Sequence, residues 1–194
     1  DRYVFEEVCS LMKRWKEEGA ELFPISVNLS RSHFVNENFL RSYVKIADKY
    51  QVDRSLIEFE VTETIFLDAS QMKKVREGLQ MIHKYGFRCS LDDFGYGYSS
   101  LTLLREFEID VLKLDRSFFM DLDSARARDV IASILDMAEK LNIHTVAEGI
   151  ETRQQMEYIK TVNCDTIQGY FFSRPLPVEE FETWFREFRI ENYI

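Results

Sequence analysis

The sequence is poor in the residues that mark disulfide-rich, zinc-binding and fibrous proteins. It has only three cysteines, three histidines, three prolines and seven glycines in 194 residues. No Cys-x-x-Cys or His-x-x-His spacing occurs, so neither a disulfide framework nor a zinc site is predicted. An apolar run near the ~20 residues of a membrane span is also lacking, as is a signal-peptide pattern. We therefore expect a cytoplasmic protein without membrane contact from this segment, although the full-length protein could carry an anchor.

Positive charge is in short supply as well. Lysine and arginine number 25 against 34 acidic residues, which gives a net charge of −9 and a pI near 5.0. A phosphate-rich polymer requires a basic face, so polymeric nucleic acid is excluded as a partner, and a smaller phosphate ligand would need cations. Hydrophobic residues make up 45% of the chain and aromatic residues 14%, which is typical of a packed globular protein. The length predicts one domain over residues 1–194.

Strand-like and helix-like segments alternate along the chain. The apolar patterns predict strands at residues 22–29, 56–63, 87–93, 109–115, 143–149 and 165–170. Apolar residues at helical spacing lie between them and predict the crossovers that parallel strands need. The last such stripe, which we expect to pack in the core, contains Phe181, Trp184, Phe185 and Phe188.

Each predicted strand has a polar side chain near its carboxyl end: Asn28, Glu60, Asp92 with Asp93, Lys113, Glu148 and Gln168. In a TIM-like (β/α)8 barrel these ends meet at one mouth, where catalytic residues collect, whereas an open sheet would spread them along an edge. The pattern therefore favours the barrel. Because the chain opens on a helix, we expect the N-terminal strand or strands to be missing, with the strands containing Val27 and Ile167 left as edges.

The chemistry of this set is that of a hard-cation site. It contains four carboxylates, two side-chain amides and one lysine, and no histidine, which suits Mg²⁺ or Mn²⁺. Two such ions ~4 Å apart commonly serve phosphodiester hydrolysis. Taken singly, the residues have plainer explanations: the aspartate pair could cap a helix, and Lys113 could be a structural ion-pair partner or a Schiff-base lysine. Their joint placement favours the metal site.

Six ordered segments of the chain then resemble a known family. They are "SVNLS" (26–30), "FEVTET" (59–64), "LDDFGYGYSSL" (91–101), "LKLDRSF" (112–118), "VAEGIET" (146–152) and "IQGYFFSRPLP" (167–177). In this order they are similar to the signature segments of EAL domains, the bacterial phosphodiesterases of cyclic di-GMP. The resemblance covers essentially the whole chain and implies a modified TIM barrel that hydrolyses cyclic di-GMP to linear pGpG with Mg²⁺ or Mn²⁺.

The resemblance also implies a role for each residue. Metal ligands would be Asn28, Glu60, Asp92 and Asp93. The catalytic residues would be Lys113, which orients the nucleophilic water, Glu148, the general-base candidate, and Gln168. The remaining assignments are Glu63, which steadies the loop after the aspartates, and the substrate-binding candidates Gly95 and Arg174.

The sequence departs from the family pattern at two places. The Glu-Ala-Leu motif is absent from the chain, so we expect residues 1–194 alone to be inactive and the full-length protein to be the enzyme. Tyr96 replaces a small residue in the loop that couples the site to a dimer interface in relatives. The alternatives are a catalytically inactive domain that binds cyclic di-GMP to regulate a partner, and a lysine-dependent lyase. A homodimer and an attached sensory or GGDEF domain are also compatible with the sequence.

Overall fold

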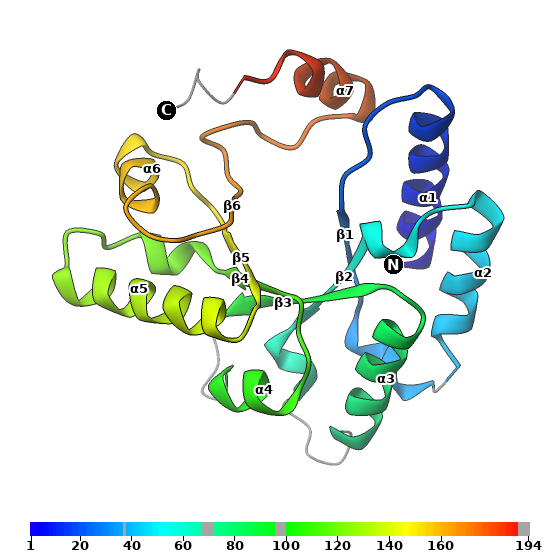
Figure 1. Ribbon diagram of the computed structural model, residues 1–194, viewed down its shortest axis with the longest axis horizontal. Coiled ribbons are helices and arrows are strands. Elements are labelled where there is room, and N and C mark those ends of the chain that lie inside the picture. The colour runs from blue at the N-terminus through cyan, green and yellow to red at the C-terminus, as the bar shows by residue number, and fades with distance from the viewer. Residues whose placement is uncertain (37, 67–71, 96–99, 190–194) are drawn as a thin grey trace. The chain divides into compact units, whose positions relative to one another are not determined.

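The fold is described from a computed structural model of the chain, which describes residues 1–36, 38–66, 72–95 and 100–189. Helices alternate with strands throughout, as the apolar patterns predict (Figure 1). The strands are β1 (Ile25–Asn28), β2 (Ile57–Thr62), β3 (Arg88–Phe94), β4 (Val111–Leu114), β5 (His144–Ala147) and β6 (Thr166–Ile167). The α-helices are α1 (Arg2–Glu17), α2 (Leu40–Tyr50), α3 (Met72–Lys84), α4 (Ser100–Glu106), α5 (Ala125–Lys140), α6 (Arg153–Ile159) and α7 (Val178–Glu187).

The strands follow one another in a single sheet in the order β1-β2-β3-β4-β5-β6. The pairs β1–β2, β2–β3 and β5–β6 are parallel, as helical crossovers require. Within the described residues the sheet has six strands rather than the eight of a complete barrel, and β1 and β6 are its ends as predicted. Short 3₁₀ helices, which the sequence pattern did not predict, follow three of the strands: η1 (Arg31–Val35), η3 (Glu63–Phe66) and η5 (Arg116–Phe119).

The chain divides into two compact units. The first comprises Asp1–Lys113 with Asn142–His144, and the second comprises Leu114–Leu141 with Thr145–Ile194.

In the first unit, helices α1 to α3 cover one face of strands β1 to β3 (Figure 1). Phe59 of β2 is fully buried on this face, with ring centroids of Phe5, Tyr43 and Phe87 at 5.6, 5.3 and 5.1 Å. Each such aromatic pair contributes about 0.5–1.5 kcal/mol beyond burial of its area. Successive strand residues point to opposite faces, so this packing directs the neighbouring Glu60 to the face away from the helices.

In the second unit, β6 is shorter than predicted, with two residues in place of the six expected. Gly149 adopts a left-handed conformation with φ +64 and bends the chain after β5. Beyond Ile167 the pairing continues as single hydrogen bonds, from Gln168 to the Ala147 carbonyl (2.8 Å) and from Ile150 to the Gln168 carbonyl (3.1 Å). The turn at Gly149 therefore ends the regular ladder early.

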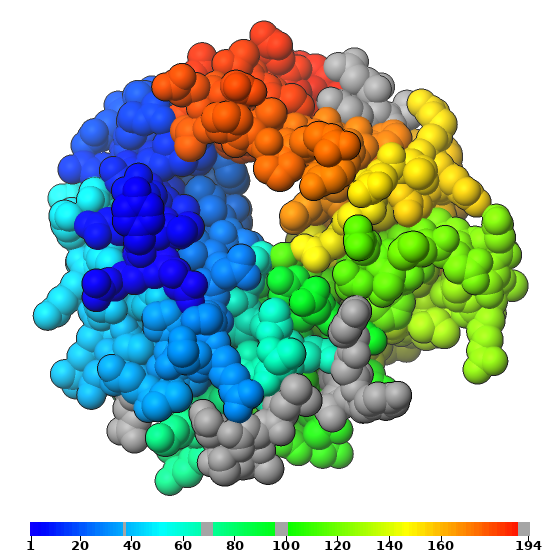
Figure 2. All heavy atoms as spheres, turned by 180° about the vertical axis from the view of Figure 1, so that it is seen from behind, coloured from blue at the N-terminus to red at the C-terminus, as the bar shows by residue number. Residues whose placement is uncertain are grey.

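The prediction that the aromatic stripe of the last helix packs in the core is wrong. None of the residues of α7 is buried, and its atoms, red in Figure 2, lie at the surface. The rings instead pack on one another, with Trp184 4.8 Å from Phe188 and Phe181 5.8 Å from Phe185 between centroids. The spacing of apolar residues predicts which face of a helix is apolar, but it does not predict which part of the protein covers that face.

Candidate functional site

Three charged side chains come together at the carboxyl ends of the central strands of the first unit. The Nζ atom of Lys113 donates a hydrogen bond to Oε1 of Glu60 at 2.6 Å and lies 3.4 Å from Oδ1 of Asp92. The side chains are 6%, 11% and 17% exposed for Lys113, Glu60 and Asp92. We call these three residues the acid–lysine cluster. At such burial, an ammonium between two carboxylates balances charge that would otherwise be costly.

Strand register explains how distant residues reach one cluster. Asn28 lies opposite Glu60 in the β1–β2 ladder, and Glu60 lies opposite Ser90 in the β2–β3 ladder. Asp92 is two residues beyond Ser90 and therefore shares its face. The ladders thus place Asn28, Glu60 and Asp92 on one face of the sheet, toward the carboxyl ends of the strands.

The loop after β3 is joined to β2 through Glu63. Oε1 of Glu63, which is buried, accepts a hydrogen bond from the backbone amide of Gly95 at 3.0 Å. Asp93, exposed, has a left-handed backbone with φ 55, and its amide donates to Oδ1 of Asp92 at 3.0 Å. The contact is what a loop-stabilising acid would make, although the role stays a prediction. Tyr96 lies outside the described residues.

The other predicted site residues belong to the second unit. Glu148 follows β5, is partly buried, and its amide donates to the Leu114 carbonyl at 3.0 Å. Gln168 and Arg174 are exposed and lie in the segment between β6 and α7. Their roles stay predictions.

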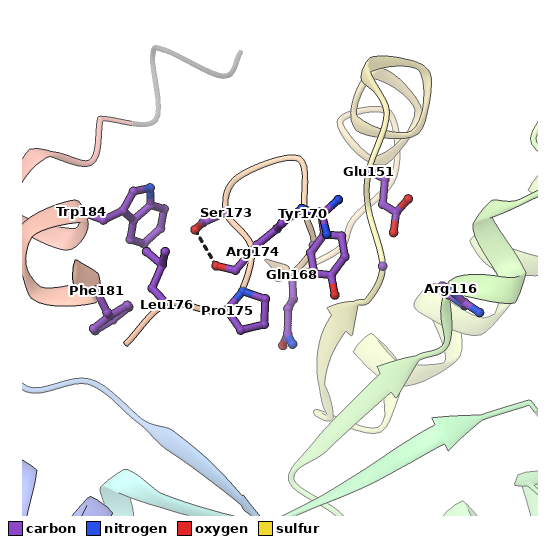
Figure 3. A pocket seen from close by; sticks show the side chains of 12 residues that line it. Arg116, Glu151, Gln168, Tyr170, Ser173, Arg174, Pro175, Leu176, Phe181 and Trp184 are labelled. Carbon is purple, nitrogen blue, oxygen red and sulfur yellow. Dashed lines mark hydrogen bonds between the residues drawn. The ribbon is translucent and has the colours of Figure 1, made fainter. Parts of the chain in front are cut away.

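Gln168 and Arg174 line a cavity of about 430 Å³ that lies wholly within the second unit (Figure 3). This volume is within the range of about 300–1,000 Å³ usual for ligand pockets. The guanidinium of Arg174 lies over the ring of Tyr170, 4.7 Å from its centroid. The remaining polar and aromatic lining comes from Arg116, Glu151, Ser173, Phe181 and Trp184. We call this cavity the second-unit pocket.

Sequence reasoning missed Arg116, Glu151 and Tyr170. Each comes two to four residues after the end of its strand, beyond the polar residues at the strand ends that predicted the site. The available signal was the same one that led to Lys113 and Glu148, because the segments after barrel strands build the ligand-binding mouth.

The donor atoms of the acid–lysine cluster suit a hard divalent cation. Asn28, Glu60 and Asp92 offer oxygens only, and thiolate and imidazole groups do not accompany them. The hydroxyl of Ser90, opposite Glu60, is fully buried and has no hydrogen-bond partner among the described residues, as expected where solvent or an ion's water shell belongs. Residues 1–36, 38–66, 72–95 and 100–189 contain no group of three or more histidine, cysteine or acidic side chains that could together hold a metal ion. The oxygen donors of Asn28, Glu60 and Asp92 fit Mg²⁺ or Mn²⁺. A complete coordination shell would need further ligands beside these three residues.

Comparison with known proteins gives one consistent family. The family model described as "EAL domain" matches residues 1–175. The chain is 33% identical to the cyclic di-GMP phosphodiesterase NbdA of Pseudomonas aeruginosa over 98% of this chain and 24% of that protein. It spans about a quarter of the length of the first curated relatives that it matches.

Solved structures agree. The EAL domain of Mycobacterium smegmatis DcpA superimposes with a TM-score of 0.87 at 27% identity, over 97% of this chain and 84% of that one. The phosphodiesterase MucR of Pseudomonas aeruginosa, solved as a cyclic di-GMP complex, gives a TM-score of 0.83 at 30% identity, over 93% of this chain and 72% of that one. These matches confirm the predicted fold class, a TIM-like (β/α)8 barrel, of which the described residues form six strands.

Proposed function

This chain belongs to the EAL domain family, and on that premise we propose that it is the phosphodiesterase domain of a protein that hydrolyses cyclic di-GMP to linear pGpG. The observation that carries the proposal is the acid–lysine cluster, in which Lys113 contacts both Glu60 and Asp92 at the carboxyl ends of parallel strands. A structural ion pair needs only one acid. Two acids on one lysine leave negative charge available for a cation.

We propose that Asn28, Glu60, Asp92 and Asp93 hold two divalent ions, Mg²⁺ or Mn²⁺. When bound, such ions activate water and neutralise charge on a phosphodiester. Lys113 keeps the carboxylates of Glu60 and Asp92 in place through its contacts of 2.6 and 3.4 Å and can orient the attacking water.

Further roles follow the family resemblance. Glu148 takes the proton of the attacking water as general base, and Gln168 contacts substrate or water. Glu63 fixes Gly95 at 3.0 Å and so fixes the start of the loop that approaches the substrate. Arg174 binds the substrate from the second-unit pocket.

The two alternatives are less well supported. A purely regulatory domain has no need for an intact acid–lysine cluster. A Schiff-base lyase requires a neutral amine, whereas Lys113 lies between two carboxylates that stabilise its charged form.

We also propose that residues 1–194 form one EAL domain, incomplete at its N-terminus, within a longer cytoplasmic protein. Cys9, Cys89 and Cys164 are free thiols. Among the helices of the described ranges, none has the length and apolarity to cross a membrane. Homodimerisation and an attached sensory or GGDEF domain complete the proposal. One relative, MucR, is named as a bifunctional diguanylate cyclase and cyclic di-GMP phosphodiesterase.

The test is turnover of cyclic di-GMP by the full-length protein with Mg²⁺, Mn²⁺ or Ca²⁺, followed by chromatography of pGpG. We expect Mg²⁺ or Mn²⁺ to support hydrolysis and Ca²⁺ to inhibit it, because Ca²⁺ prefers longer bonds and looser coordination. Binding of cyclic di-GMP without turnover under every condition would favour the regulatory alternative. Equal rates with Ca²⁺ would contradict the two-metal assignment.

A further inference from the structure

Asp1 stands at the start of α1, but its carboxylate does not cap that helix. An aspartate in this position usually accepts a hydrogen bond from an amide in the first turn of its own helix. Within the part of the chain that the structure describes, Asp1 makes no such bond. Instead, its Oδ2 atom accepts from the backbone amide of Ser30 at 2.8 Å and lies 3.0 Å from Nε2 of His33. The carboxylate therefore joins the start of α1 to the segment that follows β1.

This segment directly follows Asn28, one of the proposed metal ligands. Asn28 is the last residue of β1 and is exposed, so packing around its side chain does not fix the direction of that side chain. The amide of Leu29 donates to the carbonyl of Glu60 at 2.8 Å, and the next amide, that of Ser30, donates to Asp1. The two amides that follow Asn28 are thus held by two different elements, β2 and the start of α1.

His33 connects Asp1 to the hydrophobic core of the first unit. Its Nε2 atom also lies 3.3 Å from the hydroxyl of Tyr43, which is only 1% exposed. The ring of Tyr43 packs on the rings of Phe5 and Phe59, with centroids 4.9 and 5.3 Å away. The contacts of Asp1 are therefore anchored in tightly packed side chains, which is the support that a precisely held site needs.

A second contact fixes the same segment to α3. Phe34, next to His33 in η1, is buried and packs against Gly78. A Cβ atom on Gly78 would lie 2.6 Å from Cδ1 of Phe34, which is closer than van der Waals contact allows. Glycine is unfavourable inside a helix, and the close approach of η1 explains its presence here. The segment from Ser30 to Phe34 is therefore held at both of its ends.

From these contacts we infer that Asp1 is a positioning residue for the proposed metal site. By holding the Ser30 amide it fixes the backbone beyond β1, and it thereby directs the Asn28 side chain toward the cation. The direction of each ligand matters because Mg²⁺ requires near-ideal octahedral geometry. Asp1 acts through Asn28 and is not itself a ligand. The inference rests on the proposed function, since it presupposes that Asn28 binds the cation.

The test is a double-mutant cycle on Mn²⁺ affinity, measured by calorimetry on the full-length protein. The variants are Asp1→Ala, Asn28→Ala and the two changes combined. We expect Asp1→Ala to weaken Mn²⁺ binding about tenfold, the lower end of the range for groups that orient a metal ligand. When Asn28 is already alanine, the same change should weaken binding no further, because the side chain that Asp1 positions is gone.

Asp1→Asn separates positioning from direct ligation. The side-chain oxygen of asparagine can still accept from the Ser30 amide, but a neutral acceptor forms a weaker hydrogen bond than a carboxylate. We therefore expect Asp1→Asn to bind Mn²⁺ within about threefold of the original protein. A loss as large as that of Asp1→Ala would show that the negative charge of Asp1, rather than its hydrogen bond, is what the cation needs, and it would overturn the inference.

Asp110 provides a matched control. Like Asp1, it contacts one backbone amide and one histidine Nε2, at 2.7 and 2.8 Å. The side chains of Asp1 and Asp110 are 24% and 31% exposed. Asp110→Ala should therefore lower the urea midpoint of unfolding about as much as Asp1→Ala does. At a temperature where all variants are folded, it should leave Mn²⁺ affinity unchanged.

Unchanged Mn²⁺ affinity in Asp1→Ala, or a loss no larger than that of Asp110→Ala, would overturn the inference. Equal losses with and without Asn28 would overturn it too, because Asp1 would then act independently of that ligand. If Asn28→Ala binds Mn²⁺ as tightly as the original protein, the proposed ligand assignment fails and the inference fails with it. The Asn28→Ala variant thus distinguishes a failure of the proposed metal site from a failure of the inference alone.

Discussion

Asp92 and Asp110 are both aspartates beside strand ends of the first unit, but they lie at opposite ends and have different neighbours. At the carboxyl end, Asp92 shares Lys113 with a second acid, Glu60. At the amino end, Asp110 accepts hydrogen bonds from the amide of Cys89 at 2.7 Å and from Nε2 of His83 at 2.8 Å. The charge of Asp110 is therefore stabilised by hydrogen-bond donors of the protein. At the carboxyl end, in contrast, the two acids Glu60 and Asp92 share the one cation Lys113.

The same arrangement recurs at the amino end of the strands in the second unit. Asp165, just before β6, accepts from the amide and the hydroxyl of Thr145, both at 2.8 Å. In each unit, then, an aspartate that precedes one strand accepts hydrogen bonds from a residue at the start of the neighbouring strand. The comparison supports the proposal that Glu60 and Asp92 at the carboxyl end serve chemistry, whereas Asp110 and Asp165 at the amino ends stabilise the fold.

The largest expected effect concerns turnover at the carboxyl end. Asp92→Asn replaces an anionic ligand by a neutral amide, and we expect the cyclic di-GMP turnover of the full-length protein to fall at least about a thousandfold, or ~4 kcal/mol. Asp136→Asn, an exposed residue of α5, is the control and should change turnover little. Near-native turnover of Asp92→Asn would show that the carboxyl-end acids are not the active site.

Removal of the shared cation should affect stability more than removal of a surface lysine. Lys113→Met leaves Glu60 and Asp92 buried without a counter-charge, and we expect the free energy of unfolding without metal to fall by about 3 kcal/mol. Lys140→Met breaks a pair whose side chains are 71% and 60% exposed, and it should change the free energy of unfolding little. Urea denaturation measures both, and equal losses would refute the distinction between the buried cluster and the surface pair.

At the amino end, Asp110→Asn should weaken the fold without changing the chemistry. It removes the charge from two hydrogen bonds, and we expect a loss of about 2 kcal/mol in unfolding free energy. Turnover per folded molecule should stay near that of the original protein. A large loss of turnover at full folding would mean that the amino end also participates in catalysis.

The smallest expected effect is a pH dependence from the His83–Asp110 pair. The hydrogen bond to Asp110 raises the pKa of His83 above 6.5, so its contribution is complete below that pH and is lost as pH rises through the raised value. Burial raises the pKa of Asp110, but the bonds from His83 and the Cys89 amide outweigh it and hold the pKa below 3.8. The contribution of Asp110 is therefore complete above pH 3.8 and is lost as pH falls through the lowered value.

The pair should thus stabilise the fold most between about pH 4 and 6.5, by about 1 kcal/mol or less at its partly exposed position. Urea denaturation of the original protein and of His83→Gln over this range and up to pH 9 measures the difference. A difference that grows above pH 7 would contradict the assignment.

The alternation of strands and helices was predictable because apolar residues recur at periods that a buried face imposes. Glu60, Asp92 and Lys113 were predictable as one group because parallel strands bring their carboxyl ends together. The contact between Glu63 and Gly95 was expected from the family resemblance alone.

Features that depend on backbone turns and on what covers a surface were not predictable. The early end of β6 follows from the left-handed turn at Gly149, which a strand pattern does not encode. The aromatic stripe of α7 has the spacing of a core helix, yet Phe185 is exposed and Phe181, Trp184 and Phe188 are only partly buried. Arg116 and Glu151 line one pocket, and the side chain of Gln155 joins their segments through three hydrogen bonds that sequence spacing does not predict.

Cation binding distinguishes the two ends most directly. We would titrate the full-length protein with Mn²⁺ by calorimetry, beside its Asp92→Asn and Asp110→Asn variants, at a temperature where all three are folded. We predict that Asp92→Asn weakens Mn²⁺ binding by at least about tenfold and that Asp110→Asn leaves it unchanged. Unchanged binding in Asp92→Asn, or equal weakening in both variants, would contradict the assignment of the metal site to the carboxyl-end acids.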